Sequence, residues 1–339
     1  MLKSIITLCG KLFGRATLAA VQLFVLGVLA WSTLRIFPGD RLLPVRLGSY
    51  FLPWIFIVLI PALSIALVSR KRWTVGFTLL ALALVASRFS YLLVPQVPPA
   101  SADFAGNQLR VMTFNVHYLN DNVDGITQLI QTEKPDVVAL QELSEKLGRR
   151  LLHQLGNEYP YYSVGGHSTV TISRYPLARL DKPADTIRSE RTMVNTSAGD
   201  IEVWNIHPPT AIHQQGWEAQ NRMFSAIAAE IKNETGPVIV LGDFNSTDQA
   251  ENYQLIASRL TNVHHAVGKG FGFTFPDPSI ARTIGGVPRF GRIPVNVNPV
   301  VHIDHIFVSD HFTPVETHII PSGYGSDHRP VVATLQIRQ

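Results

Sequence analysis

The sequence has 339 residues, 46% of them hydrophobic, and a formal net charge of +4. The hydrophobic fraction excludes an intrinsically disordered chain, and the single cysteine, Cys9, excludes an intramolecular disulfide framework and a cysteine-based zinc site. Up to Val94, ten Lys or Arg stand against Asp40 alone, so the rest carries 19 basic and 24 acidic residues, a net charge of −5. This balance does not support a surface for binding nucleic acids.

Three apolar stretches occupy the first 94 residues: Ala16–Leu34, Tyr50–Val68 and Trp73–Val94. Each is close to the roughly 20 residues that a helix needs to cross a hydrocarbon core. Pro53 and Pro61 are tolerated in a membrane helix that packs against neighbours. A cleaved signal peptide is the alternative for the first stretch, but the two stretches behind it favour a retained anchor. We therefore expect a three-helix transmembrane anchor over residues 1–94.

Basic residues in short loops predict the orientation of this anchor. Those in the two predicted cytoplasmic segments are Lys3, Lys11, Arg15 and the run Arg70-Lys71-Arg72. The N-terminus is then cytoplasmic, and everything after Val94 lies on the periplasmic or extracellular side of the cytoplasmic (inner) membrane. Arg41 and Arg46, in the first outer loop, count against this orientation.

A stiff, polar, proline-rich linker is predicted over residues 95–108, followed by a domain over residues 109–339. Short apolar strands alternate with turns in this domain. They are predicted over Leu109–Asn115, Asp136–Glu142, Ile201–His207, Pro237–Asp243, His302–Val308 and Val331–Ile337. A helix through Ile126–Gln131 and an amphipathic helix over Gln215–Lys232 are also predicted, and the latter is expected to cover a sheet face.

Polar side chains recur where these strands end. The five ends are Asn115, Glu142, His207, Asp243 with Asn245, and the Asp327-His328 pair just before the final strand. A rigid strand end beside an accessible loop is the usual position for chemistry in layered α/β folds. The pattern predicts an active site assembled from these ends.

Seven short motifs resemble the endonuclease/exonuclease/phosphatase superfamily, in the family's order. They are Thr113-Phe-Asn115, Leu140-Gln-Glu142, Ser173-Arg-Tyr-Pro176, Asn205-Ile-His207, Gly242-Asp-Phe-Asn245, Ile303-Asp304-His-Ile-Phe-Val and Gly325-Ser-Asp327-His328-Arg-Pro330. The match covers almost all of residues 109–339. It implies an α/β fold, a four-layer sandwich of two packed mixed sheets flanked by helices.

A three-span anchor before such a domain is similar to the bacterial VanJ-like branch of this superfamily. That resemblance implies dephosphorylation of a polyprenyl pyrophosphate carrier and a link to glycopeptide-antibiotic resistance at the cell envelope. Two positions depart from other branches. His117 stands where abasic-site nucleases have aspartate, and Asp304 lies in Ile-Asp-His where inositol-phosphate phosphatases have Cys-Asp-Arg. The sequence therefore disfavours those two substrate classes.

The resemblance also implies the roles of the site residues. Hydrolysis of a phosphoester needs a metal ion, an oriented water and an acid for the leaving group. Mg²⁺, with Mn²⁺ as the alternative ion, is expected on Glu142 and Asp327, because hard cations take oxygen ligands.

The remaining roles concern the water, the proton and the phosphate. Asp243 is expected to orient and deprotonate the water, His207 to act as the acid, and His328 to bind the phosphate as a cation that Asp304 orients. The amides expected to contact the phosphate, or the hydration shell of the metal, are those of Asn115 and Asn245. Arg174 is assigned to substrate binding, with a structural role as its alternative.

Simpler interpretations exist for some of these residues. Asp243 and Asn245 are also typical caps of a helix that begins at Ser246. His207 is compatible with a plain loop residue before two prolines. The long Gly/Pro-rich stretch Phe275–Pro299 fits a loop that shapes the substrate site.

The sequence leaves three classes of function. The first is a membrane-bound, Mg²⁺-dependent phosphohydrolase acting on a lipid-linked pyrophosphate. The second is a membrane-tethered exported endonuclease or other phosphodiesterase, and the third is an idle scaffold. The anchor favours the first, because it concentrates the domain where lipid head groups lie. The expected partners are a lipid-linked phosphate and the bilayer. Nucleic acid is disfavoured for want of a basic stripe, and the oligomeric state stays open.

Overall fold

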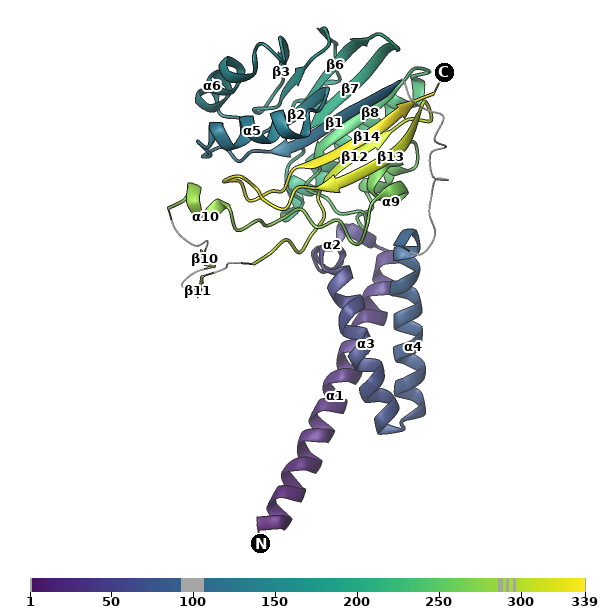
Figure 1. Ribbon diagram of the computed structural model, residues 1–339. Helices are drawn as coiled ribbons and strands as arrows, with labels where there is room; N and C mark the ends of the chain where they lie inside the picture. Colours follow the sequence, from purple (N-terminus) through teal and green to yellow (C-terminus); the bar gives the residue numbers. More distant parts are fainter. Residues whose placement is uncertain (1, 93–106, 286–288, 291–292, 295–296, 339) are drawn as a thin grey trace. The chain divides into compact units, whose positions relative to one another are not determined.

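The computed structural model describes residues 2–92, 107–285, 289–290, 293–294 and 297–338. The chain divides into two compact units, Met1–Leu93 and Val94–Gln339 (Figure 1). Most of the linker predicted over residues 95–108 lies outside the described residues, which resume at Asn107.

The first unit is helical. Its elements are α1 (Leu2–Ile36), the 3-10 turn η1 (Gly39–Arg41), α2 (Leu43–Tyr50), α3 (Leu52–Ser69), α4 (Arg72–Ala86) and the 3-10 segment η2 (Ser87–Leu92). Three stretches are long and apolar enough to cross a membrane: Cys9–Ile36, Leu52–Ser69 and Arg72–Leu92. They correspond to the three predicted spans, although the first helix begins well before Ala16. These helices could anchor the chain in a membrane.

Polar contacts and proline placement fit a packed bundle. The side-chain amide of Gln22 donates to Thr74 Oγ1 at 2.8 Å, which joins α1 to α4. Such interhelical hydrogen bonds stabilise association inside a bilayer. Pro53 lies in the first turn of α3, where its missing N–H removes no helical bond, and Pro61 lies inside that helix.

The second unit is built on two six-stranded sheets. The first contains β1 (Gln108–Asn115), β2 (Val137–Gln141), β3 (Tyr161–Val164), β4 (Val170–Ser173), β13 (Phe312–Ile319) and β14 (Val331–Ile337). The second contains β5 (Leu177–Arg179), β6 (Ser189–Thr196), β7 (Gly199–Ile206), β8 (Val238–Asp243), β9 (Thr261–Asn262) and β12 (Asp304–Val308). A separate ribbon is formed by β10 (Arg289–Phe290) and β11 (Ile293–Pro294).

Both six-stranded sheets are mixed. Their strand orders are β13-β14-β1-β2-β4-β3 and β5-β6-β7-β8-β12-β9. In each, one central pair is parallel, β1 with β2 and β7 with β8, and the other pairs are antiparallel.

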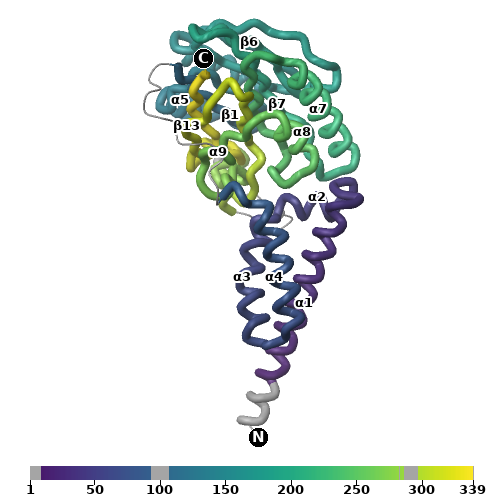
Figure 2. Tube along the Cα trace, turned by 90° about the vertical axis from the view of Figure 1, so that its right-hand side faces the viewer, coloured from purple at the N-terminus to yellow at the C-terminus, as the bar shows by residue number. Residues whose placement is uncertain are grey.

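Helices cover the outer faces of both sheets. The helices of this unit are α5 (Val123–Glu133), α6 (Glu145–Leu155), η3 (Ala184–Thr186), α7 (Gln214–Asn233), α8 (Tyr253–Ala257), α9 (Val263–Val267) and α10 (Ile280–Thr283). One apolar cluster joins α5 and α6 to the first sheet, a second fills the space between the sheets, and a third joins α7 and α8 to the second sheet. Figure 2 shows α5 and α7 on opposite sides of the strands. The four-layer α/β sandwich expected from the sequence is confirmed.

Parallel pairing gathers polar strand ends at one edge. Asn115 and Glu142 come together because β1 and β2 pair in parallel up to Asn115. His207 and Asp243 come together because β7 and β8 pair in parallel up to Gly242. We call this shared edge the catalytic edge.

The six predicted strands correspond to β1, β2, β7, β8, β12 and β14, and the two predicted helices to α5 and α7. Two boundaries matter for the site. β2 ends at Gln141 and β7 at Ile206, so Glu142 and His207 lie just beyond their strands. The strands β3 to β6 and β13 are too short or too polar in pattern to have been predicted.

Candidate active site

An amide links two carboxylates from the two sheets. Nδ2 of Asn115 donates to Oε1 of Glu142 at 3.1 Å and to Oδ2 of Asp243 at 2.9 Å. The side-chain oxygen of Asn115 accepts the backbone N–H of His117 at 3.0 Å, which fixes the amide orientation. Asn115 therefore fixes the positions of the two carboxylates relative to each other.

The backbone is unusual where the site residues leave their strands. Glu142 and Asn245 have φ values of 54° and 47°, in the left-handed region that non-glycine residues rarely adopt. Such conformations persist where the surroundings impose them, and they concentrate at functional sites. At Glu142 the turn leaves the side chain 32% exposed, and the backbone N–H of Tyr118 donates to its Oε2 at 3.2 Å.

His207 lies between the same two carboxylates. Its Nε2 is 3.6 Å from Oε1 of Glu142 and 3.5 Å from Oδ2 of Asp243. Its Nδ1 is buried and has no hydrogen-bond partner among the described residues. His207 therefore lies with Glu142 and Asp243 at the catalytic edge, as the sequence predicts for a site residue.

Asn245 closes a turn over Asp243. Its backbone N–H donates to Oδ1 of Asp243 at 2.8 Å, and its Nδ2 donates to the carbonyl of Pro208 at 3.1 Å. No helix begins at Ser246, since the next described one is α8 at Tyr253. The helix-cap interpretation of this motif is therefore wrong.

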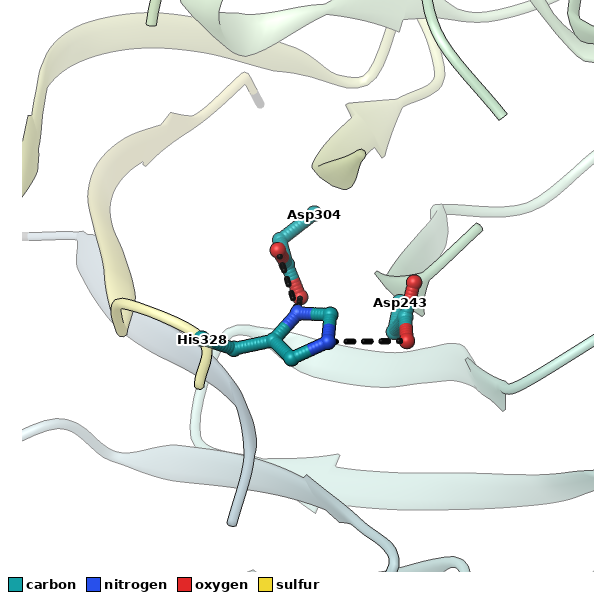
Figure 3. A group of neighbouring side chains, drawn as sticks. All are labelled: Asp243, Asp304 and His328. Atoms are coloured by element: carbon teal, nitrogen blue, oxygen red, sulfur yellow. Dashed lines mark hydrogen bonds and ion pairs between the residues drawn. The ribbon is translucent and has the colours of Figure 1, made fainter. Parts of the chain in front are cut away.

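His328 lies between two buried carboxylates (Figure 3). Its Nδ1 is 3.0 Å from Oδ2 of Asp304, and its Nε2 is 3.7 Å from Oδ2 of Asp243. Ser326 positions this histidine, because its hydroxyl donates to the carbonyl of Asn115 at 2.7 Å and accepts the backbone N–H of His328 at 3.0 Å.

Electrostatics keep His328 cationic. Burial by itself lowers the pKa of His328, but the charges of Asp304 and Asp243 outweigh it and raise the pKa from 6.5 to about 10. The negative charge of Asp327 adds to this rise. A buried imidazolium bound to Asp304 is thus available to neutralise a phosphate oxygen.

The donor set fits a hard divalent cation. Asp243, Asp304 and His328 offer ligand atoms within 4.8 Å of one another. However, His328 is protonated and hydrogen-bonded to Asp304, so it has no lone pair for a metal. Glu142 suits the ion better, because its exposed carboxylate leaves room for the waters that Mg²⁺ keeps.

The last two predicted site residues differ in their positions. Asp327 is half-buried and its negative charge acts on His328, so its role as a metal ligand stays a prediction. Arg174 follows β4 beside Asp136, at the far end of β2, and lies over the ring of Tyr159 at 5.1 Å. About 20 Å of strand separates this position from Glu142. The substrate-binding assignment of Arg174 is therefore wrong, and its structural alternative fits.

Two supporting residues, Thr274 and Gln220, were not predicted from the sequence. Thr274 Oγ1 accepts the backbone N–H groups of Ile303 and Asp304 at 3.3 and 3.4 Å. Gln220 on α7 donates to the carbonyls of Phe244 and Asn245 at 3.2 and 3.1 Å. A signal for Gln220 was present, since it is a buried polar residue on an otherwise apolar helix face.

Known proteins share this fold. The chain matches the model of the Endonuclease/Exonuclease/phosphatase family over residues 112–328. An endonuclease/exonuclease/phosphatase from Beutenbergia cavernae is 21% identical, with a TM-score of 0.52 over 69% of this chain and 72% of that chain. The mannosyl-6-phosphatase from Bacteroides thetaiotaomicron is 17% identical, with a TM-score of 0.52 over 67% of this chain and 99% of that one.

TDP2 from D. rerio, complexed with a single strand DNA product, is 18% identical, with a TM-score of 0.52 over 68% of this chain and 99% of that chain. No curated protein matches the chain significantly. The family match covers well over half of the chain and spans all the residues that converge at the catalytic edge. The chain therefore belongs to the endonuclease/exonuclease/phosphatase family, whose members are hydrolases that act on phosphoester bonds and commonly use divalent metals.

Proposed function

We propose that this chain is a membrane-anchored, divalent-metal-dependent phosphohydrolase that cleaves a lipid-linked pyrophosphate of the polyprenyl class at the outer face of the cytoplasmic membrane. One observation carries the proposal: a full set of hydrolytic side chains follows three helices that are apolar and long enough to cross a membrane. Such an anchor keeps the site at the surface where lipid head groups lie.

Each group at the catalytic edge has a step to perform. When bound, the cation neutralises charge on the non-bridging phosphate oxygens, and Glu142 is the residue that would hold it. Asp243 accepts the proton of the attacking water, since its Oδ2 faces the site and is fixed by Asn115. His328, kept cationic by Asp304, donates to the phosphate. His207, next to both carboxylates, is placed to protonate the leaving oxygen.

The charge of the chain supports a lipid-linked substrate over a nucleic acid. The residues after Val94 carry a net −5, which gives no general attraction for a duplex. The likeness to TDP2 with its DNA product concerns the fold alone. The alternative function is that of an endonuclease or other phosphodiesterase, whose substrate would be a phosphodiester.

The test compares substrates on the reconstituted full chain. Inorganic phosphate release from a polyprenyl pyrophosphate in vesicles, from a sugar phosphate and from a soluble short-chain pyrophosphate is measured at equal Mg²⁺, beside nicking of plasmid DNA. We expect the fastest turnover on the polyprenyl pyrophosphate and its loss in EDTA. Faster nicking of plasmid than release from any pyrophosphate, with the nicking abolished in His328→Ala, would replace this proposal with a nuclease.

A further inference from the structure

Loops at the catalytic edge carry exposed apolar side chains. In the described part of the second unit, the large hydrophobic side chains that are exposed are Tyr118, Leu119, Tyr161, Tyr162, Val164, Ile187, Ile212, Ile284 and Val297. Four of them, Tyr118, Leu119, Ile187 and Ile212, are between 51% and 64% exposed and lie on three loops beside catalytic groups. We call these four residues the apolar rim.

Backbone hydrogen bonds connect two of the three rim loops to the site, and the chain order places the third loop. The N–H of Tyr118 donates to Glu142, which places Tyr118 and Leu119 beside the metal-binding candidate. Ile187 precedes Arg188, whose carbonyl accepts the N–H of His207 at 2.9 Å. Ile212 lies in the loop that starts at His207 and leads into α7. The three loops that carry the rim therefore all lie at the catalytic edge.

Neither packing in the core nor the proposed reaction explains why the four apolar side chains of the rim are exposed. Side chains exposed by half or more contribute little to the stability of the fold. Grouped exposed apolar residues in a soluble domain usually mark a protein or membrane contact. Each loop also carries a basic or titratable neighbour in sequence: His117 before Tyr118, Arg188 after Ile187 and His213 after Ile212. Apolar side chains interleaved with such groups suit a bilayer interface, where phosphates and acyl chains meet.

We propose that the apolar rim is the surface by which the catalytic domain docks onto the bilayer that holds its own transmembrane helices. The occupant is the lipid surface, because the three candidate spans keep that surface within reach of the domain. A tyrosine with an apolar ring and a polar hydroxyl is suited to the head-group region. Docking would bring the catalytic edge to the level of lipid phosphates.

The length of the tether allows this docking. The described domain resumes at Asn107, and β1 runs from Gln108 at the far edge to Asn115 at the catalytic edge, a length of about 26 Å. The residues 93–106 between the two units can span at most about 48 Å. The contour length of this segment therefore exceeds the length of β1, so a tether that joins the far edge still allows the catalytic edge to reach a membrane.

A depth measurement tests the docking without any substrate. Cys9 is the single cysteine, so Cys9→Ser gives a background in which Leu119→Cys carries one environment-sensitive fluorophore. The matched control is Ser197→Cys in the β6–β7 turn, about 23 Å of strand away from Ile206. In vesicles containing brominated lipids, we expect quenching and a blue shift at position 119 and neither at 197. Equal signals at the two positions would overturn the proposal.

A kinetic measurement separates docking from chemistry. Replacing the four rim residues with serine is expected to lower the rate on a lipid-linked pyrophosphate in vesicles by about tenfold or more, because the lost apolar contacts weaken docking. The rate on a soluble short-chain pyrophosphate should stay unchanged. Tyr162→Ser, which removes a side chain that is 55% exposed on β3, is the control and should change neither rate. An equal loss on both substrates would overturn the docking role.

The proposal rests on the anchoring of the chain and not on the identity of its substrate. If position 119 is quenched while no lipid pyrophosphate is hydrolysed, the docking surface stands and the proposed function falls. If lipid pyrophosphate is hydrolysed while position 119 stays in water, the docking surface falls and the proposed function stands.

Discussion

The charge state of His328 controls how the site should respond to pH. Its pKa is raised to about 10 by the carboxylates of Asp304 and Asp243, against the effect of burial. The stabilising contribution of the imidazolium is therefore complete below pH 6.5 and is lost as the pH rises through about 10. We expect hydrolysis that depends on this cation to persist to alkaline pH, and a pH–rate profile measures it.

Asp304→Asn tests the cause of that profile. Removing the carboxylate that contacts Nδ1 at 3.0 Å should move the alkaline limb down toward pH 6.5. Asp327→Asn serves as the control, because the effect of Asp327 on His328 is weaker and its loss should move the limb less. An alkaline limb that stays in place in Asp304→Asn would show that His328 is not the group being titrated.

Glu142 is expected to matter for activity far more than for folding. Glu142→Gln keeps the shape of the side chain but removes the charge that suits a hard cation, so activity should fall by about 100-fold or more. The side chain is partly exposed, so the melting temperature should change little. Arg174→Ala, far from the catalytic edge, is the comparison: activity should hold while stability falls with the loss of its contact on Tyr159. Full activity of Glu142→Gln in excess EDTA would contradict a metal role.

The sequence predicted the side chains at strand ends better than the residues that hold them. Parallel register brings Asn115, Glu142, His207 and Asp243 to one edge. Asp304 and His328 reach the same edge because Asp304 begins β12 and His328 precedes β14, and these strands pair antiparallel with β8 and β1. Arg174 was misplaced because a motif says nothing about which end of an antiparallel strand it occupies. Ser326 and Thr274 act through hydroxyl contacts with the backbone, and those contacts exist only once distant loops meet.

At the scale of elements, the close approach of β7 to β8 requires a glycine at position 242, directly before Asp243. Its φ is +152°, and a Cβ there would lie 2.0 Å from the carbonyl oxygen of Ile206 on the neighbouring strand. Gly242→Ala must therefore separate β7 from β8, and we expect a loss of about 2–4 kcal/mol of stability. Gly236→Ala is the control, since a Cβ there meets nothing within 4 Å. Thermal unfolding of both variants measures the difference, and equal melting temperatures would contradict the argument.

The segment after Thr274 illustrates what periodicity does not reveal. The sequence showed only a long Gly/Pro-rich stretch from Phe275 to Pro299. In the structure, the buried carboxylate of Asp277 accepts from Ser279 at 2.9 Å, from Gly323 at 3.1 Å and from Arg329 at 2.6 Å. Asp277 is thus joined to the segment around His328 by an ion pair with Arg329 and a backbone contact with Gly323. No residue pattern predicts these two contacts, because their partners are more than 40 residues apart.

For the whole molecule, the predicted orientation of the anchor decides on which side of the membrane the catalytic domain lies. The basic residues before the first span and the Arg70 to Arg72 run predict a cytoplasmic N-terminus. Arg41 and Arg46 oppose this count. The guanidinium of Arg46 donates to the backbone carbonyl of Asp40 at 3.1 Å, within the same unit.

We therefore expect a reporter that is active only outside the cytoplasm to be active when fused after the last residue, and a reporter that is active only inside to be inactive. Replacing Arg70, Lys71 and Arg72 with glutamine should reduce the outside signal, because Arg70 and Lys71 form the short turn between α3 and α4 and Arg72 begins α4. Glutamine in place of Arg41 and Arg46 is the matched control and should leave the outside signal unchanged or raise it.

A strong cytoplasmic signal from the unaltered chain would put the catalytic edge on the inner leaflet. The lipid pyrophosphate would then have to be sought there, while docking by the apolar rim would still be required, because it depends on the tether and not on the side of the membrane.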